Sequence, residues 1–231
     1  MKKLLKLIGL LIIIVLAVLI VNTLRLSSRQ VAANTLESIE LPNDVYQNLS
    51  KAIQYPTISF SEDAIPDSTA FFGFHRFLEE TFPLTHKKLS LEKISDYSLL
   101  YKWQGSNTSK KPIILMSHQD VVPVDEPTLG DWEAGPFSGK ITDTHIIGRG
   151  TMDDKGTLIG LMEAVEKLLE ESFVPSQTIY LAFGHDEEVG GGNGAAAITA
   201  HLKAKGIHAA MTLDEGGFIA EDIVPGVDSP V

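Results

Sequence analysis

The apolar positions of this chain follow two different periods, which predict strands and helices in alternation. Short apolar runs typical of buried strands lie at 97–103, 113–117, 178–183 and 209–213. Apolar residues at the three- and four-residue spacing typical of helices lie at 44–54, 71–82, 156–171 and 195–205. Strands that alternate with helices predict an α/β fold in which helices flank a central sheet.

The longest apolar segment predicts a helix that enters a membrane. Residues 7–21 contain no polar side chain, and with their neighbours they form a helix of roughly 30 Å, about the thickness of a bilayer core. Basic residues before this segment favour a cytoplasmic N-terminus. We therefore expect residues 1–26 to be an uncleaved signal-anchor, 27–42 to be a polar stalk, and 43–231 to lie outside the cytoplasm.

Two other interpretations of residues 7–21 stay open. A cleaved secretory signal would release the protein from the membrane, although residues 21–25 offer no convincing small-residue cleavage site. A buried core helix would have a similar composition. In a eukaryotic secretory pathway Asn48 and Asn107 would be glycosylation acceptors, because each begins an Asn-x-Ser/Thr tripeptide.

Charge and cysteine content limit the partners and the metal ligands that this chain can use. Residues 1–30 hold 5 of the 19 basic residues and no acidic residue, so the other 201 residues carry 14 basic and 30 acidic side chains, a formal charge of −16. This balance argues against a nucleic-acid partner, since phosphate binding needs clustered lysine and arginine. The chain has no cysteine, which leaves histidine and carboxylates as the ligands of any metal.

Histidine and carboxylates follow directly after the predicted strands. They lie in His118-Gln119-Asp120, in His185-Asp186-Glu187-Glu188, in Asp214-Glu215 and, before the helix at 156–171, in Asp153-Asp154. Open α/β folds build their sites at the carboxyl edge of the sheet, so we expect these side chains to converge. Converging carboxylates repel one another unless a multivalent cation lies among them. The sequence therefore predicts a metal site.

The spacing within these motifs suggests particular roles. In an extended His118-x-Asp120 both side chains point the same way, so Asp120 can accept the proton of the far ring nitrogen of His118. Of the adjacent Glu187 and Glu188, one can bind metal while the other acts as a general base. Each motif also has an ordinary structural interpretation: a buried His–Asp pair, helix capping at Asp153, or a solvated strand end at the two glutamates.

Five motifs in this order resemble the dinuclear zinc metallopeptidases that include glutamate carboxypeptidase, aminoacylase and succinyl-diaminopimelate desuccinylase. The motifs are Ser-His-Gln-Asp-Val-Val-Pro-Val (117–124), Pro-Phe-Ser-Gly (136–139), Gly-Arg-Gly-Thr-Met-Asp-Asp-Lys-Gly (148–156), Gly-His-Asp-Glu-Glu-Val-Gly-Gly (184–191) and Leu-Asp-Glu-Gly-Gly (213–217). The last two are most similar to the carboxypeptidase S branch, which includes the N-fatty-acyl-amino-acid synthase/hydrolase.

The resemblance implies a central mixed sheet and a site with two zinc ions. The implied ligands are His118, Asp153 and Asp214 for one ion and Asp153, shared between the ions, and Glu188 for the other. Glu187 is the implied general base, and Asp120 is the implied partner of the His118 ring. The peptide bond between Asp153 and Asp154 is expected to be cis.

Members of this family continue beyond the last motif with a lid and dimerisation domain, the rest of the catalytic sheet and a late histidine. We therefore expect residues 43–231 to be the N-terminal part of a catalytic domain, weakly active or inactive alone. The complete enzyme would hydrolyse the amide bond of a peptide or N-acyl amino acid with a free carboxylate, and would form a homodimer through its lid. The alternative is a truncated or non-catalytic anchored protein that uses the carboxylates as a structural metal site.

Overall fold

The computed structural model describes residues 2–25 and 41–216. They belong to two units, Met1–Glu40 and Leu41–Val231, which we describe separately. In the first unit, helix α1 (Lys2–Leu24) reaches a mean hydropathy of 3.3 and is long and apolar enough to cross a membrane. The predicted stalk, 27–42, lies outside the described residues except for its last two positions.

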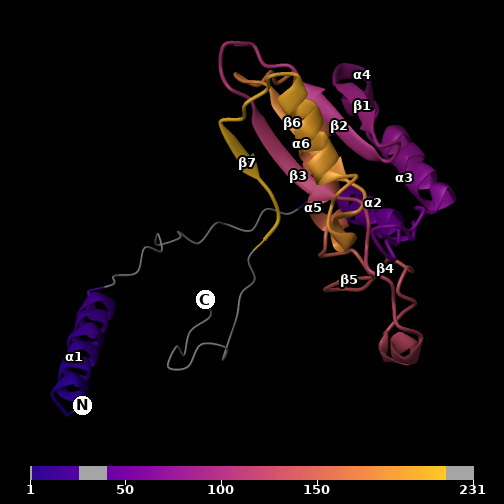
Figure 1. The fold of residues 1–231 in the computed structure, drawn as a ribbon. Coiled ribbons are helices and arrows are strands. Elements are labelled where there is room, and N and C mark those ends of the chain that lie inside the picture. The colour runs from indigo at the N-terminus through magenta and orange to yellow at the C-terminus, as the bar shows by residue number, and fades with distance from the viewer. Residues whose placement is uncertain (1, 26–40, 217–231) are drawn as a thin grey trace. The chain divides into compact units, whose positions relative to one another are not determined.

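The second unit is built on a mixed sheet of five strands in the order β1-β2-β6-β3-β7 (Figure 1). The strands are β1 (Ser90–Ile94), β2 (Ser98–Trp103), β3 (Ile113–His118), β6 (Ile179–Gly184) and β7 (Met211–Leu213). Strand β2 is antiparallel to β1 and β6, whereas β3 is parallel to both β6 and β7. A separate hairpin pairs β4 (Lys140–Ile141) with β5 (Ile146–Ile147). The carboxyl ends of β3, β6 and β7 therefore lie at one edge of the sheet.

Helices cover both faces of this sheet. They are α2 (Asn43–Ile53), α3 (Ser68–Thr81), α4 (Pro83–Lys88), α5 (Lys155–Glu170) and α6 (Ala195–Ala204), with the short 3-10 helices η1 (Glu126–Asp131) and η2 (Glu187–Val189). Successive residues of a strand point to opposite faces. Leu99 and Tyr101 of β2 therefore join the core formed with α3 and α5, while Leu100 packs with Ile198 and Leu202 of α6 on the other face.

The sequence pattern predicts most of this architecture but misses its shortest elements. Every predicted strand and helix of the second unit is present close to its expected range, and Gly206, with a φ of +68°, follows α6. The pattern does not predict β1, α4 or the β4–β5 hairpin. Helix α4 has six residues and begins with a proline, too short for a helical period to show. Strand β1 has no fully buried residue, so its apolar alternation is weak.

We predict that His75 makes the fold less stable at low pH. Its buried ring has Nε2 2.8 Å from Gln119 Oε1, and Nδ1 has no partner among the described residues. Burial lowers the pKa of His75 from 6.5 to about 4, so between these values the unfolded chain binds a proton that the folded chain does not. The stability contributed by neutral His75 is complete above pH 6.5 and is lost as the pH falls toward 4.

Urea denaturation across this pH range tests the prediction. His75→Gln keeps a donor for Gln119 and removes the titration. The free energy of unfolding of the unsubstituted chain should fall more steeply than that of the variant, by up to about 1.4 kcal/mol per pH unit. His145→Gln, at an exposed position, is the matched control. Parallel curves for His75→Gln and the unsubstituted chain would show that His75 has no such effect.

Candidate metal centre

The predicted site residues lie at the end of a strand or in the segments that follow different strands. His118 is the last residue of β3, and Asp214 follows β7. Glu187 and Glu188 begin η2, shortly after β6, while Asp153 lies in the loop before α5. Because β3 is parallel to both β6 and β7, the residues after these strands share one edge of the sheet despite their separation in sequence.

His118 is the centre of the cluster. Its side chain is only 2% exposed, and its Nε2 atom lies 2.8 Å from Asp153 Oδ1. Glu215 Oε1 and Glu187 Oε2 approach the same nitrogen at 3.4 Å and 3.8 Å. Two groups have ligand atoms within 4.8 Å of one another: His118 with Asp153 and Glu188, and His118 with Glu187 and Glu215. Several carboxylates thus gather around one imidazole nitrogen.

Asp120 joins His118 to the turn that carries the two glutamates. Its buried carboxylate has Oδ1 3.3 Å from His118 Nδ1, and its backbone oxygen lies 3.0 Å from the same nitrogen. Its two carboxylate oxygens also accept the backbone N–H groups of Glu187 at 3.1 Å and Glu188 at 3.2 Å. One buried side chain therefore contacts the imidazole and holds η2 in place.

The two aspartates before α5 have different surroundings. Asp153 is 65% exposed and lies next to the His118 ring. Asp154 is buried, and its Oδ2 accepts the Ser117 hydroxyl at 2.5 Å and the His118 N–H at 3.4 Å. The peptide bond between the aspartates is cis, as the family resemblance predicts. Asp154 thus links the loop to β3, and Asp153 presents its carboxylate to the cluster.

The electrostatics of this cluster favour a cation. Burial alone would lower the pKa of His118, but the hydrogen bond and charge of Asp120, followed by Glu215 and Asp153, raise it to about 10. Burial first, and then the charge of Asp153, raises the pKa of Glu188 to about 7. Both shifts arise because carboxylates crowd a poorly hydrated region and favour positive charge among them.

The donor set also fits a divalent metal. Imidazole nitrogen and carboxylate oxygen, without thiolate, are the ligands of Zn²⁺ in many hydrolytic sites. Ligating histidines usually have their second ring nitrogen hydrogen-bonded to a carboxylate or a carbonyl, and Asp120 offers both to His118. The residues of this centre therefore match a metal ion in both charge and ligand type.

Glu215 approaches His118 more closely than the sequence pattern suggests. Asp214 is exposed, and its Oδ1 accepts the Glu215 N–H at 3.0 Å. Within the described part of the chain, Asp214 belongs to neither of the two ligand groups, whereas Glu215 belongs to one. Both residues line a cavity of about 250 Å³ together with His118 and Glu187. The role of Asp214 as a ligand stays a prediction.

Two buried polar residues of these motifs, Gln119 and His185, have contacts that the sequence does not predict. The Gln119 amide donates to the carbonyl oxygens of Tyr97 at 3.0 Å and Phe183 at 2.9 Å. His185, which its motif places beside the glutamates, is buried with Nδ1 2.7 Å from Ser98 Oγ. A glutamine at the end of an apolar strand is a usable signal, because a buried amide must find hydrogen-bond partners.

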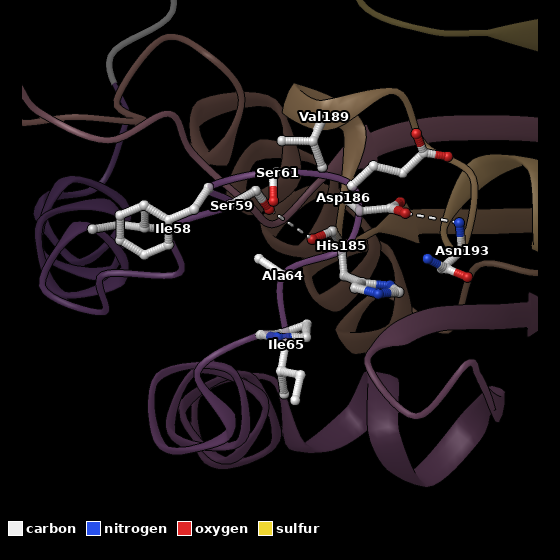
Figure 2. Close-up of a pocket in the computed structure, with 12 residues that line it drawn as sticks. Ile58, Ser59, Ser61, Ala64, Ile65, His185, Asp186, Val189 and Asn193 are labelled. Carbon is white, nitrogen blue, oxygen red and sulfur yellow. Dashed lines mark hydrogen bonds between the residues drawn. The ribbon is translucent and has the colours of Figure 1, made fainter.

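A small pocket lies behind the turn that carries the glutamates (Figure 2). It has a volume of about 50 Å³ and is lined by residues from 58–66 and 185–193. Figure 2 shows the Asp186 carboxylate directed at Asn193, whose backbone N–H it accepts at 2.7 Å. None of the candidate ligands lines this pocket. It is therefore distinct from the metal centre.

Comparison with known proteins assigns the site to a family of peptidases. Residues 114–227 match the model of peptidase family M20/M25/M40, and the chain belongs to this family. The match begins within β3 and includes all the residues that converge on His118. The family resemblance inferred from the five motifs is confirmed.

Curated relatives give the same result over a larger part of the chain. The probable carboxypeptidase S-like 2 of Dictyostelium discoideum is 43% identical over 96% of this chain and 44% of that protein. The N-fatty-acyl-amino acid synthase/hydrolase of Homo sapiens is 40% identical over 79% of this chain and 36% of that protein. Carboxypeptidase S of Saccharomyces cerevisiae is 40% identical over 78% and 33%. The chain spans less than half the length of each of these relatives.

Solved structures support the fold. An M20 family metallo-carboxypeptidase from Sulfolobus solfataricus is 25% identical, with a TM-score of 0.58 over 76% of this chain and 38% of that one. Human carnosine dipeptidase 1 has a TM-score of 0.59 at 16% identity, over 78% of this chain and 40% of that one, which shows likeness of fold alone. The mixed sheet flanked by helices is thus the M20-like fold.

We predict that Asp120→Asn weakens the binding of Zn²⁺. Asparagine keeps the volume of the side chain but puts an NH₂ group where Glu187 or Glu188 now donates an N–H. Loss of such a supporting contact typically lowers metal affinity by about 10–100-fold. Competition with a chromophoric chelator measures the affinity, with Asp131→Asn, at an exposed position, as the control. Equal affinity in Asp120→Asn and the unsubstituted chain would exclude a positioning role for Asp120.

Proposed function

We propose that this chain provides the metal centre of a zinc-dependent hydrolase that cleaves amide bonds. The gathering of Asp153, Glu187 and Glu188 around His118 is the observation that supports this proposal, because hydrolytic zinc sites use these donors. In the proposal two Zn²⁺ ions bind. His118, Asp153 and Asp214 hold one ion, and Asp153 and Glu188 hold the other.

The residues around the ligands have distinct parts in the proposed reaction. Bound zinc would act as a Lewis acid toward the scissile carbonyl and would lower the pKa of water. Glu187, whose carboxylate is half exposed beside the His118 ring, accepts the proton of the attacking water and passes it to the leaving nitrogen. Asp120 holds the N–H groups of Glu187 and Glu188, which keeps the base and the ligand at a fixed separation.

We further propose that the substrate is a peptide or an N-acyl amino acid with a free carboxylate. The proposal is drawn from relatives named carboxypeptidase S and N-fatty-acyl-amino acid synthase/hydrolase. The chain spans 44% or less of these relatives. We therefore propose, for the whole protein, both this hydrolytic activity and a homodimer formed through a lid domain.

We predict that Glu187→Gln separates turnover from metal binding. Glutamine keeps the size of the side chain and removes the base, so hydrolysis should fall by about 10²–10⁴-fold while bound zinc is retained. Glu188→Gln should instead lower the zinc content, because it removes a proposed ligand. Atomic absorption after dialysis measures zinc, and amine release from an N-acyl amino acid measures hydrolysis. The zinc content of the two variants distinguishes a ligand from a base even where turnover by the chain alone is weak.

Further variants test the rival interpretation and the remaining ligand. A structural metal site in a non-catalytic protein would bind a cation, calcium included, and would lose little function in Glu187→Gln. Zinc loss in Glu187→Gln with none in Glu188→Gln would reverse the two assigned roles. Asp214→Asn should lower the zinc content and Glu215→Gln should not. The opposite result would make Glu215 the ligand.

We propose that α1 anchors the protein in a membrane, with residues 43–231 outside the cytoplasm, or that the protein is secreted if this segment is cleaved. The length and composition of α1 support both forms. Asn107 is exposed, whereas the Asn48 amide donates to Glu163 Oε1 at 2.8 Å. In a glycosylating host, Asn107 is therefore the better acceptor.

We predict that the chain stays in the membrane pellet after alkaline carbonate extraction, because α1 remains attached. Mass spectrometry of the purified protein should then find peptides from within residues 2–24. A soluble protein that lacks these peptides would establish cleavage of a signal sequence. Deleting residues 2–24 is the control and should abolish sedimentation.

A further inference from the structure

Lys155, two residues after the candidate ligand Asp153, is a buried cation that the proposed hydrolysis does not use. Its side chain is fully buried, and Nζ donates to the carbonyl oxygens of Ala52 at 3.2 Å and Tyr55 at 2.5 Å. The same atom lies 4.8 Å from the centroid of the Phe74 ring. In the described part of the chain no carboxylate lies within 4.0 Å of it.

The groups that hold this ammonium lie at the end of helix α2. Ala52 belongs to the last turn of the helix, and Tyr55 follows the C-cap residue Gln54. The Ala52 carbonyl also accepts the Tyr55 N–H at 3.3 Å, and the Tyr55 carbonyl also accepts the Thr57 N–H at 2.9 Å. The C-terminus of a helix carries the negative end of the helix dipole, so the Ala52 carbonyl presents partial negative charge to the ammonium. The face of the Phe74 ring adds a cation–π contact. Backbone carbonyl dipoles and the Phe74 ring, instead of a carboxylate counter-ion, therefore hold the Lys155 ammonium.

The backbone of Lys155 also fixes the loop that presents Asp153. Its N–H donates to the Gly150 carbonyl at 3.0 Å and so closes the loop over residues 150–155. Gly150 has a φ of +86°, and a Cβ atom at this position would lie 2.6 Å from Val121 Cγ1 and 3.6 Å from Lys155 Cδ. Lys155 thus connects the end of α2 to the loop whose Asp153 carboxylate lies 2.8 Å from His118 Nε2.

We propose that Lys155 is a positioning residue for the metal centre: its ammonium, seated on the carbonyls at the end of α2, holds the loop so that Asp153 meets His118. This inference rests on the proposed function, because it gives Lys155 a part in zinc binding. Packing alone needs no charge at this position. A buried ammonium without a counter-ion loses its hydration, and methionine would fill the same space with a flexible apolar chain.

Lys155→Met tests the inference because it keeps an unbranched, flexible side chain, one atom shorter than lysine, and removes the directed contacts of Nζ. We expect zinc affinity to fall by about 10–100-fold, as is typical for residues that orient metal ligands, with an unchanged far-UV circular dichroism spectrum. Lys167→Met is the matched control. Lys167 lies in the same helix, is exposed, and contacts Glu170 at 3.3 Å. Unchanged zinc affinity in Lys155→Met would overturn the inference.

Chemical rescue separates charge from packing. The chain has no cysteine, so Lys155→Cys introduces a single thiol that can be alkylated in the unfolded chain before refolding. Aminoethylation rebuilds a lysine-like ammonium, whereas propylation gives a neutral side chain of the same length. We expect only the aminoethyl adduct to recover zinc affinity. Equal affinity of the two adducts, or folding only of forms that carry the ammonium, would make Lys155 a purely structural residue.

The unsubstituted chain distinguishes the two ways in which the test can fail. If it binds no Zn²⁺, the proposed function fails, and the assignment of Lys155 to a zinc centre fails with it. If the unsubstituted chain and Lys155→Met bind Zn²⁺ equally well, the inference about Lys155 fails and the proposed function stands.

Discussion

Carboxylates from separate parts of the chain converge on one buried imidazole, and the repulsion among them constrains the rest of the structure around it. The fold answers this repulsion by dividing the acidic residues into two sets. Asp120 and Asp154 are buried, and their oxygens accept backbone N–H groups or a hydroxyl. Asp153 and Glu187 are exposed beside His118. The buried acids give the site its shape, and the exposed acids remain available to a cation.

The register of the sheet explains why this division is possible. His118 pairs with Gly184 across β3 and β6, so the turn after β6 begins next to the imidazole. The Gln119 amide bonds to the carbonyls of Phe183 and Gly184, which fixes the strand ends at the same level. A slip of one residue would turn the histidine to the opposite face of the sheet. The metal centre therefore depends on strand pairing as much as on its own acidic residues.

The sequence predicts the helices and strands that show a regular apolar period, and it predicts the side chains that follow strands. It does not predict contacts between distant segments of the chain. Strand-end carboxylates identify His118, Asp153 and the two glutamates as neighbours because the edge of an α/β sheet is a general property of the fold. The orientation of Asp214 relative to Glu215 depends on how the chain leaves β7, and no local pattern encodes it. The sequence likewise does not predict the burial of Lys155, since a lysine near the start of a helix normally has a solvated side chain.

The position of β6 between β2 and β3 has a consequence for the order in which the protein takes shape. As the chain leaves the ribosome, β2 can pair with β1 at once, but neither β2 nor β3 can pair with β6 until β6 has been made. Such contacts between distant segments form late, because closing the long loop between them costs conformational entropy before the contacts can stabilise the fold. Glu187 and Glu188 begin η2, shortly after this strand. One event during synthesis therefore closes the centre of the sheet and brings the two glutamates to His118.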